Sequence, residues 1–216
     1  MNMIISYRAV MDWFKSNFKL LILLEAVCMM TAAVYFLLAP RIYEASFAIS
    51  LPKVLASPGA NANQPKHRLL MSPQDFIRPT RDPMAYSDEF IKSCMGHDTN
   101  ENRKKLINSL QLDVKQQGDV IAFTLRLEGS ERSANCANLM LTRSFDNLTV
   151  NQDRYLQANP LIANDPNNFI RPGLVRSIRI SDSYIKPDLN RLLSMAIIAG
   201  IFLSISISIL RKKYRA

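Results

Sequence analysis

Histidine, glycine and cysteine are scarce in this sequence of 216 residues, which holds 2 His, 6 Gly and 3 Cys. The two histidines, His67 and His97, belong to no H-E-x-x-H or comparable metal-binding pattern. The chain also lacks a G-x-x-x-x-G-K-[ST] phosphate-binding loop and a G-x-S-x-G nucleophile motif. The sequence therefore offers no catalytic residues, no cofactor-binding residues and no metal ligands, and we expect a protein that is not an enzyme.

Two long apolar runs are the strongest pattern that is present. Leu20–Leu38 is interrupted only by Glu25, and Leu192–Leu210 contains no charged residue. Each run has 19 residues, which as a helix is roughly 28 Å long and matches the hydrocarbon core of a bilayer. Buried helices of soluble proteins are usually shorter, so we predict two transmembrane helices. The first has no small-residue cleavage site and is better explained as a retained anchor than as a signal peptide.

The net charge of +9 would suit a nucleic-acid-binding protein, but its distribution favours a membrane protein. Residues 191–216 carry five basic and no acidic residues, and residues 1–38 carry three basic residues against two acidic ones. Basic segments that flank transmembrane helices usually stay in the cytoplasm. We therefore expect both termini in the cytoplasm of a bacterium, contacts of the basic tail with membrane lipids, and no nucleic-acid partner.

These patterns divide the chain into segments. We expect a cytoplasmic amphipathic N-terminus over 1–19, transmembrane helix 1 over 20–38, a periplasmic domain over 39–191, transmembrane helix 2 over 192–210, and a cytoplasmic basic tail over 211–216.

Alternation of apolar and polar side chains predicts four strands in the middle domain. Tyr43–Leu51 alternates strictly. The segments 110–114 and 120–127 alternate on either side of Gln117-Gly118, which predicts a β-hairpin. A last strand is expected over 174–181.

Helical spacing predicts three helices in the same domain. Asp82 followed by proline is a typical helix start, and this helix should reach Met95. A short helix should begin near Asn100, and a long one should cover about 130–156. The expected buried residues are Met84, Ser87, Phe90, Ile91 and Cys94 in the first helix, Leu106 and Ile107 in the second, and Ala134, Ala137, Leu141, Phe145 and Leu148 in the third.

The remaining segments, 52–79 and 158–173, hold several prolines and little periodicity, so we expect long loops there. Strand, helix, hairpin, helix and strand then follow one another along the chain. This is the β-α-β-β-α-β order of ferredoxin-like folds. The predicted fold class is α+β, with a ferredoxin-like periplasmic domain between two transmembrane helices.

The three cysteines differ in their expected surroundings. Cys28 lies inside the first apolar run and is expected to be a small apolar filler. Cys94 and Cys136 lie in the predicted periplasmic domain, where a disulfide would persist. Both also lie on apolar faces of predicted helices, so we favour buried free thiols, and a Cys94–Cys136 bond is the alternative.

Small residues and one acid stand out within the apolar runs. Ala196, Gly200, Ser204 and Ser208 recur every four residues, which permits close approach of another helix, either the first span or a neighbouring subunit. Glu25 lies about a turn and a half inside the predicted cytoplasmic end. An ionisable residue there is a candidate functional site, although snorkelling of its carboxylate to the interface is the favoured explanation.

Three segments together resemble one family. They are IISYRAVMDWFKSNFKLLILLEAV with APRIYEASFAISL near the N-terminus, LDVKQQGDVIAFTLRLEGSERSANCANLMLTRSF in the middle, and residues 180–215 at the end. Their order is similar to that of the polysaccharide chain-length determinant family, the Wzz-type polysaccharide co-polymerases. Pro187 and Gly200 are the positions that match the family's proline-containing segment and glycine-bearing second span.

The resemblance implies a non-enzymatic homo-oligomer of the bacterial inner membrane. It implies control of the chain length of O-antigen of lipopolysaccharide, capsule or exopolysaccharide, with a polysaccharide polymerase and the growing glycan as partners. The chain departs from the family in having only one proline before the second span, no long projecting helices and no tyrosine-kinase module. An alternative expectation is a structural scaffold subunit of a secretion or cell-envelope complex.

Overall fold

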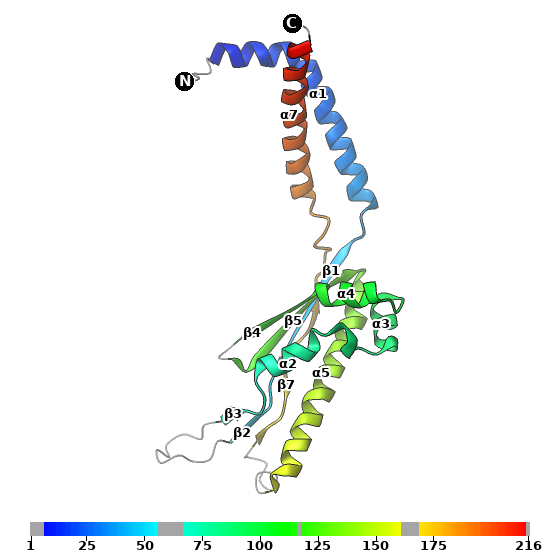
Figure 1. Cartoon of the computed structure of the whole chain (residues 1–216), viewed down its shortest axis with the longest axis vertical. Coiled ribbons are helices and arrows are strands. Elements are labelled where there is room, and N and C mark those ends of the chain that lie inside the picture. The colour runs from blue at the N-terminus through cyan, green and yellow to red at the C-terminus, as the bar shows by residue number, and fades with distance from the viewer. Residues whose placement is uncertain (1–6, 56–66, 116–117, 161–168, 215–216) are drawn as a thin grey trace. The chain divides into compact units, whose positions relative to one another are not determined.

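The computed structural model describes residues 7–55, 67–115, 118–160 and 169–214. The chain divides into two compact units, one comprising Met1–Pro40 with Lys186–Ala216 and the other comprising Arg41–Ile185. The first unit holds two long apolar helices, and the second holds the strands and the remaining helices (Figure 1). The predicted mixed α+β class, with a sheet-containing region between two apolar helices, is therefore confirmed.

The helices of the first unit are α1, Tyr7–Leu38, and α7, Leu189–Tyr214. Their stretches Trp13–Leu38 and Leu189–Arg211 are long and apolar enough to cross a membrane. Few of the residues in these stretches are buried inside the protein, whereas a core helix of a soluble protein would be mostly buried. The predicted N-terminal helix and first span form one continuous helix, which Figure 1 draws with a bend.

Four strands of the second unit form the main sheet. They are β1 (Ile42–Ser50), β4 (Leu110–Lys115), β5 (Val120–Glu128) and β7 (Gly173–Ile180), in the order β4-β5-β1-β7. All neighbours are antiparallel, and the predicted strands are confirmed to within a residue or two. The alternation in β1 puts the side chains of Ala45, Phe47 and Ile49 into the core, where the rings of Phe47 and Phe123 stack 4.4 Å apart.

The expected loops contain structure that the sequence analysis missed. A second sheet has the order β3-β2-β6, from β3 (His67–Leu69), β2 (Lys53–Leu55) and β6 (Phe169–Ile170). These strands of two or three residues are too short to show a period of two. Helix α2, Pro73–Thr80, follows an N-cap at Ser72, whose side chain accepts a hydrogen bond from the backbone nitrogen of Asp75.

The helix expected to start at Asp82 is divided. The Asp82 side chain does accept a hydrogen bond from Met84 N, but it starts only the short 3-10 turn η1, Pro83–Ala85. Ser87, expected in a buried stripe, is a second N-cap and begins α3, Asp88–Met95. The Met84 side chain is consequently 74% exposed, and its predicted burial is wrong.

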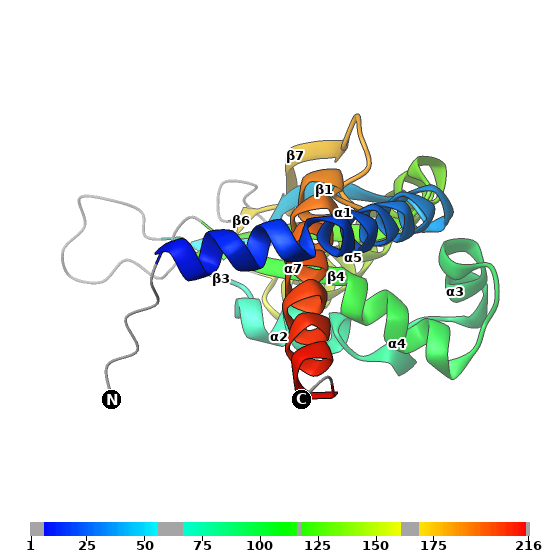
Figure 2. The same ribbon diagram turned by 90° about the horizontal axis from the view of Figure 1, so that it is seen from above.

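The other predicted helices are present as α4, Asn100–Ser109, and α5, Ser130–Ala158. Helix α5 packs along the core face of the main sheet (Figure 1), and α3 and α4 lie next to each other (Figure 2). The predicted helix residues that are buried in the core are Phe90, Ile91, Cys94, Leu106, Ala137 and Leu148, and Ala134, Leu141, Phe145 and Ile107 are half-buried.

A disulfide joins Cys94 of α3 to Cys136 of α5, across 42 residues of sequence. Both side chains are fully buried. The favoured expectation of free thiols is therefore wrong. The apolar faces of both helices correctly indicated burial, but sequence spacing could not show that these two faces meet.

Removing this disulfide should destabilise the second unit. Closing a loop of this length contributes roughly 4 kcal/mol by restricting the unfolded chain. We expect Cys94→Ala/Cys136→Ala to lower the free energy of unfolding by about 2–4 kcal/mol, measured by chemical denaturation of the detergent-solubilised full chain. Cys28→Ala, which removes the unpaired cysteine of α1, is the matched control. Equal unfolding midpoints for the double variant and this control would contradict the prediction.

Candidate functional site

The small-residue stripe of α7 forms one side of a helix seam with α1. Ala196 and Ser204 are 7% and 0% exposed, Gly200 is also buried, and Ser208 is half-buried. Most residues between them are exposed, because a spacing of four keeps the stripe on one face of the helix. Helices α1 and α7 contact each other, and Figure 1 shows the first turns of α1 extending away from α7.

Glu25 lies in this seam, against the glycine of the stripe. A Cβ atom built on Gly200 would lie 2.6 Å from the Glu25 Cδ atom, which is too close for a non-bonded contact. Only glycine at position 200 leaves room for this placement of the carboxyl group. The Glu25 carboxyl group thus lies close to the backbone of α7 at Gly200, and snorkelling of this group to an interface stays a prediction.

A second polar contact lies at another level of the seam. The indole nitrogen Nε1 of Trp13 donates a hydrogen bond to the Ser208 hydroxyl oxygen, at 2.6 Å. Sequence spacing within α7 does not pair these residues, because it does not identify the face of α1 that contacts α7. That face is visible as half-buried positions that recur every three or four residues. They are Trp13, Asn17, Leu20, Leu21, Leu24, Glu25, Cys28, Ala32 and Phe36.

Pro187 stands just before α7 and follows a cis peptide bond with Lys186. The next residue, Asp188, accepts a hydrogen bond on its carboxylate from the backbone nitrogen of Asn190 in the first turn of the helix. The structure thus places Pro187 at the entrance to α7, away from the stripe residues in sequence.

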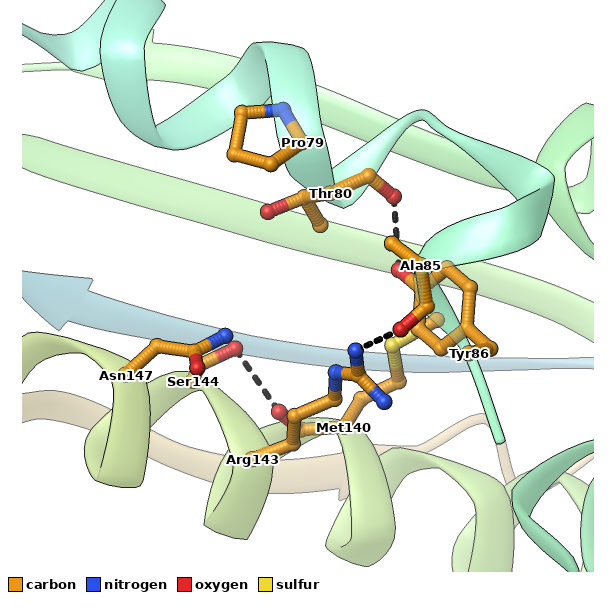
Figure 3. Close-up of a pocket in the computed structure, with 8 residues that line it drawn as sticks. All are labelled: Pro79, Thr80, Ala85, Tyr86, Met140, Arg143, Ser144 and Asn147. Atoms are coloured by element: carbon orange, nitrogen blue, oxygen red, sulfur yellow. Dashed lines mark hydrogen bonds between the residues drawn. The ribbon is translucent and has the colours of Figure 1, made fainter.

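A small hollow lies between α5 and the segment that carries α2 and η1 (Figure 3). The side chains of Arg143 and Tyr86 form hydrogen bonds with backbone carbonyls that line it. Arg143 donates a hydrogen bond to the Ala85 carbonyl, and its guanidinium lies 4.6 Å from the centre of the Tyr86 ring. The Tyr86 hydroxyl donates to the Thr80 carbonyl at 2.6 Å, and burial raises the pKa of Tyr86 to about 12. The hollow is therefore a packing junction between helices.

Arg103 of α4 is the centre of a polar network in the second unit. Its guanidinium donates to Asp98 at 2.7 Å and to Asp88 at 2.6 Å, and to the carbonyls of Tyr86 and Pro83 at 2.7 and 3.3 Å. It thereby ties α4 to α3 and η1. The hydrogen bond from Arg103 holds the pKa of Asp98 below its usual value.

No protein-family model and no curated protein matches this chain. Within the described ranges, no group of three or more His, Cys, Asp and Glu side chains is arranged to hold a metal ion.

The seam should not tolerate a large side chain at its glycine. We expect Gly200→Leu to push α1 and α7 apart and to cost about 1–3 kcal/mol of helix-pair stability through overpacking. Trp13 is the only tryptophan, so its fluorescence in a lipid nanodisc reports on the seam. The variant should make Trp13 more accessible to a soluble quencher, as Ser208→Ala should to a smaller extent.

Gly200→Ala should have less effect than Gly200→Leu, because the nearest atoms belong to the flexible end of Glu25. Phe202→Leu is the matched control on the same helix, since Phe202 is 72% exposed. If the soluble quencher reduces Trp13 fluorescence equally in Gly200→Leu and Phe202→Leu, the seam does not depend on the glycine.

The Arg103 network should make stability depend on pH in the acidic range. The depressed pKa of Asp98 contributes stability above the ordinary aspartate pKa, and this contribution is lost as pH falls through the lower, folded-state pKa. We expect Asp98→Asn to flatten this part of the stability–pH profile, measured by denaturation across a pH series. Asp146→Asn changes an exposed carboxylate on α5 and serves as the control. Parallel profiles for the Asp98 variant and wild type would contradict the assignment.

Proposed function

We propose that the protein is a two-span protein of the bacterial inner membrane, with residues 41–185 in the periplasm and both termini in the cytoplasm. Two observations support this placement. The basic residues that flank the apolar helices favour cytoplasmic termini. The Cys94–Cys136 disulfide supports a periplasmic domain, because disulfides persist there and are rare in the cytosol.

The domain is, in this proposal, a variant of the ferredoxin-like fold. Counted along the chain, the strands of the main sheet are arranged as second, third, first and fourth, and all neighbours are antiparallel. Helices separate the first strand from the second and the third from the fourth. Both features support the β-α-β-β-α-β pattern. The short sheet of β2, β3 and β6 is an addition to it.

The proposed activity is non-enzymatic control of the chain length of a surface polysaccharide, namely O-antigen, capsule or exopolysaccharide. The observation that carries it is the pair of apolar helices, joined along a small-residue seam, that flank a disulfide-linked α+β domain. This layout agrees with the resemblance to chain-length determinants. Several copies of the chain would assemble, and their domains would hold the polymerase or the growing glycan near the membrane.

Deleting the gene tests this function directly. If assembled domains set when polymerisation stops, their loss should broaden the length distribution of the surface glycan while synthesis continues. Gel electrophoresis of the extracted glycan measures the distribution. Wild-type protein should restore the narrow distribution, with Phe202→Leu as the control variant and Gly200→Leu as the test of the seam. An unchanged ladder in the deletion strain would contradict the proposal. An unchanged ladder together with a secretion defect would favour the alternative of a scaffold in a secretion or cell-envelope complex.

A further inference from the structure

The main sheet has a second face, opposite the core, which we call the outer face. Ala45, Phe47 and Ile49 of β1 point into the core, so Ser46 and Ala48 between them belong to the outer face. In the described part of the chain, the helices that pack against this sheet do so through its core face, whose side chains form the core cluster with theirs.

Two rows of side chains cross the outer face from β4 to β7. Residues paired across antiparallel strands share a face, so the register defines each row. The rows are Gln111, Thr124, Ser46 and Arg179, and Asp113, Ala122, Ala48 and Arg176. The small residues occupy the two central strands and the long residues occupy the two edge strands. With strands about 4.8 Å apart, this gives a flat floor between borders roughly 14 Å apart.

An irregularity in β7 brings its two arginines to the same face. Arg176 and Arg179 are three residues apart, and in a regular strand they would point to opposite faces. The pairing of β1 with β7 shifts between Ser46 and Ala48 and again after Ala48, so that Arg179 pairs with Ser46 and Arg176 with Ala48. Bulges of this kind often re-aim side chains at functional places.

The two arginines of β7 differ from Arg126 and Lys53 in having no acidic partner among the described residues. Arg126 is paired with Glu44 at 2.9 Å, and Lys53 is paired with Asp119 at 2.5 Å. Arg176 and Arg179 are exposed, and neither side chain has a hydrogen bond or ion pair with any described residue. A guanidinium group binds carboxylate or phosphate through two parallel hydrogen bonds, so this pair is suited to an anionic ligand.

We propose that the outer face binds an acidic glycan chain, whose carboxylates contact Arg176 and Arg179. The hydroxyl groups of Ser46 and Thr124 face the sugar hydroxyls, and the Gln111 amide at the β4 border donates a hydrogen bond to Asp113 at 3.1 Å. Asp113, at the opposite border, repels carboxylates and so directs them toward β7. The two rows contain no aromatic side chain on which a nucleic-acid base would stack and no large apolar side chain that would enter a lipid layer. The choice of a glycan rests on the proposed function.

Binding to defined oligosaccharides tests the inference. The full chain in a zwitterionic nanodisc is titrated with oligogalacturonate and with a neutral malto-oligosaccharide of equal length, by isothermal calorimetry. We expect binding of the acidic oligomer only. Arg176→Gln/Arg179→Gln should weaken it on the order of tenfold or more, because each guanidinium loses charge-assisted hydrogen bonds. Asp113→Asn should strengthen it a few-fold.

Arg154→Gln is the matched control, because it removes the same charge from an exposed position on α5. Circular dichroism and retention of the disulfide confirm that each variant is folded. Equal affinity of the double arginine variant and this control would overturn the inference, as would equal binding of the neutral oligomer. Arginine-dependent binding to phosphatidylglycerol vesicles without binding to oligogalacturonate would replace the glycan with a membrane surface and would also overturn it.

The two proposals can fail separately. An unchanged glycan ladder in the deletion strain, with arginine-dependent oligogalacturonate binding intact, would remove the proposed function and leave the binding site standing. A broadened ladder without such binding would support the function and overturn the site.

Discussion

The alternation of side chains along β1 is the constraint on which the sheet-containing unit depends. β1 pairs with both β5 and β7, so its register determines which residues of both neighbours face the core. Phe47 is the centre of this arrangement, since it stacks on Phe123, which in turn contacts the edge of Phe76 from α2. A one-residue slip would expose these rings and bury the polar alternate set. The same alternation places the small side chains of β1 on the opposite face. The composition of the core face and that of the outer face therefore both follow from the register of β1.

The helices that cover the core are held to one another by contacts that alternation does not specify. The disulfide joins α3 to α5, and Arg103 joins α4 to α3 and η1 through two carboxylates and two carbonyls. Each guanidinium hydrogen bond in this network involves a charged group, and such bonds are stronger than neutral ones. The helices α3 and α4 have only eight and ten residues, too short to be stable alone. Their positions therefore depend on these cross-links as well as on the core.

The sequence predicted the parts of this protein that repeat a pattern and missed those that depend on single contacts. The strands β1 and β5 are nine residues long, so a period of two is unmistakable, whereas β2, β3 and β6 are too short to show one. The capping signal at Asp82 was correct locally, yet Ser87 supplied a second signal that divided the helix. In the seam, spacing alone identified the stripe of α7. The contacts of Glu25 with Gly200 and of Trp13 with Ser208 require knowledge of how two helices face each other, which no spacing within one helix supplies.

Small residues have different structural roles in the two units, and each role depends on the residues around them. In α7 they are buried against α1, where the absence of a side chain at Gly200 lets a helix that carries a glutamate approach closely. In the proposed membrane setting, an acidic group that faces lipid is costly, and the Glu25 carboxyl group lies instead against Gly200 of α7. On the outer face of the sheet, Ser46, Thr124 and Ala122 are half-buried and Ala48 is buried, and these small side chains lie beside the exposed arginines of β7. Small residues thus permit close packing where a second helix covers them, and they leave a shallow surface where long, charged neighbours border them.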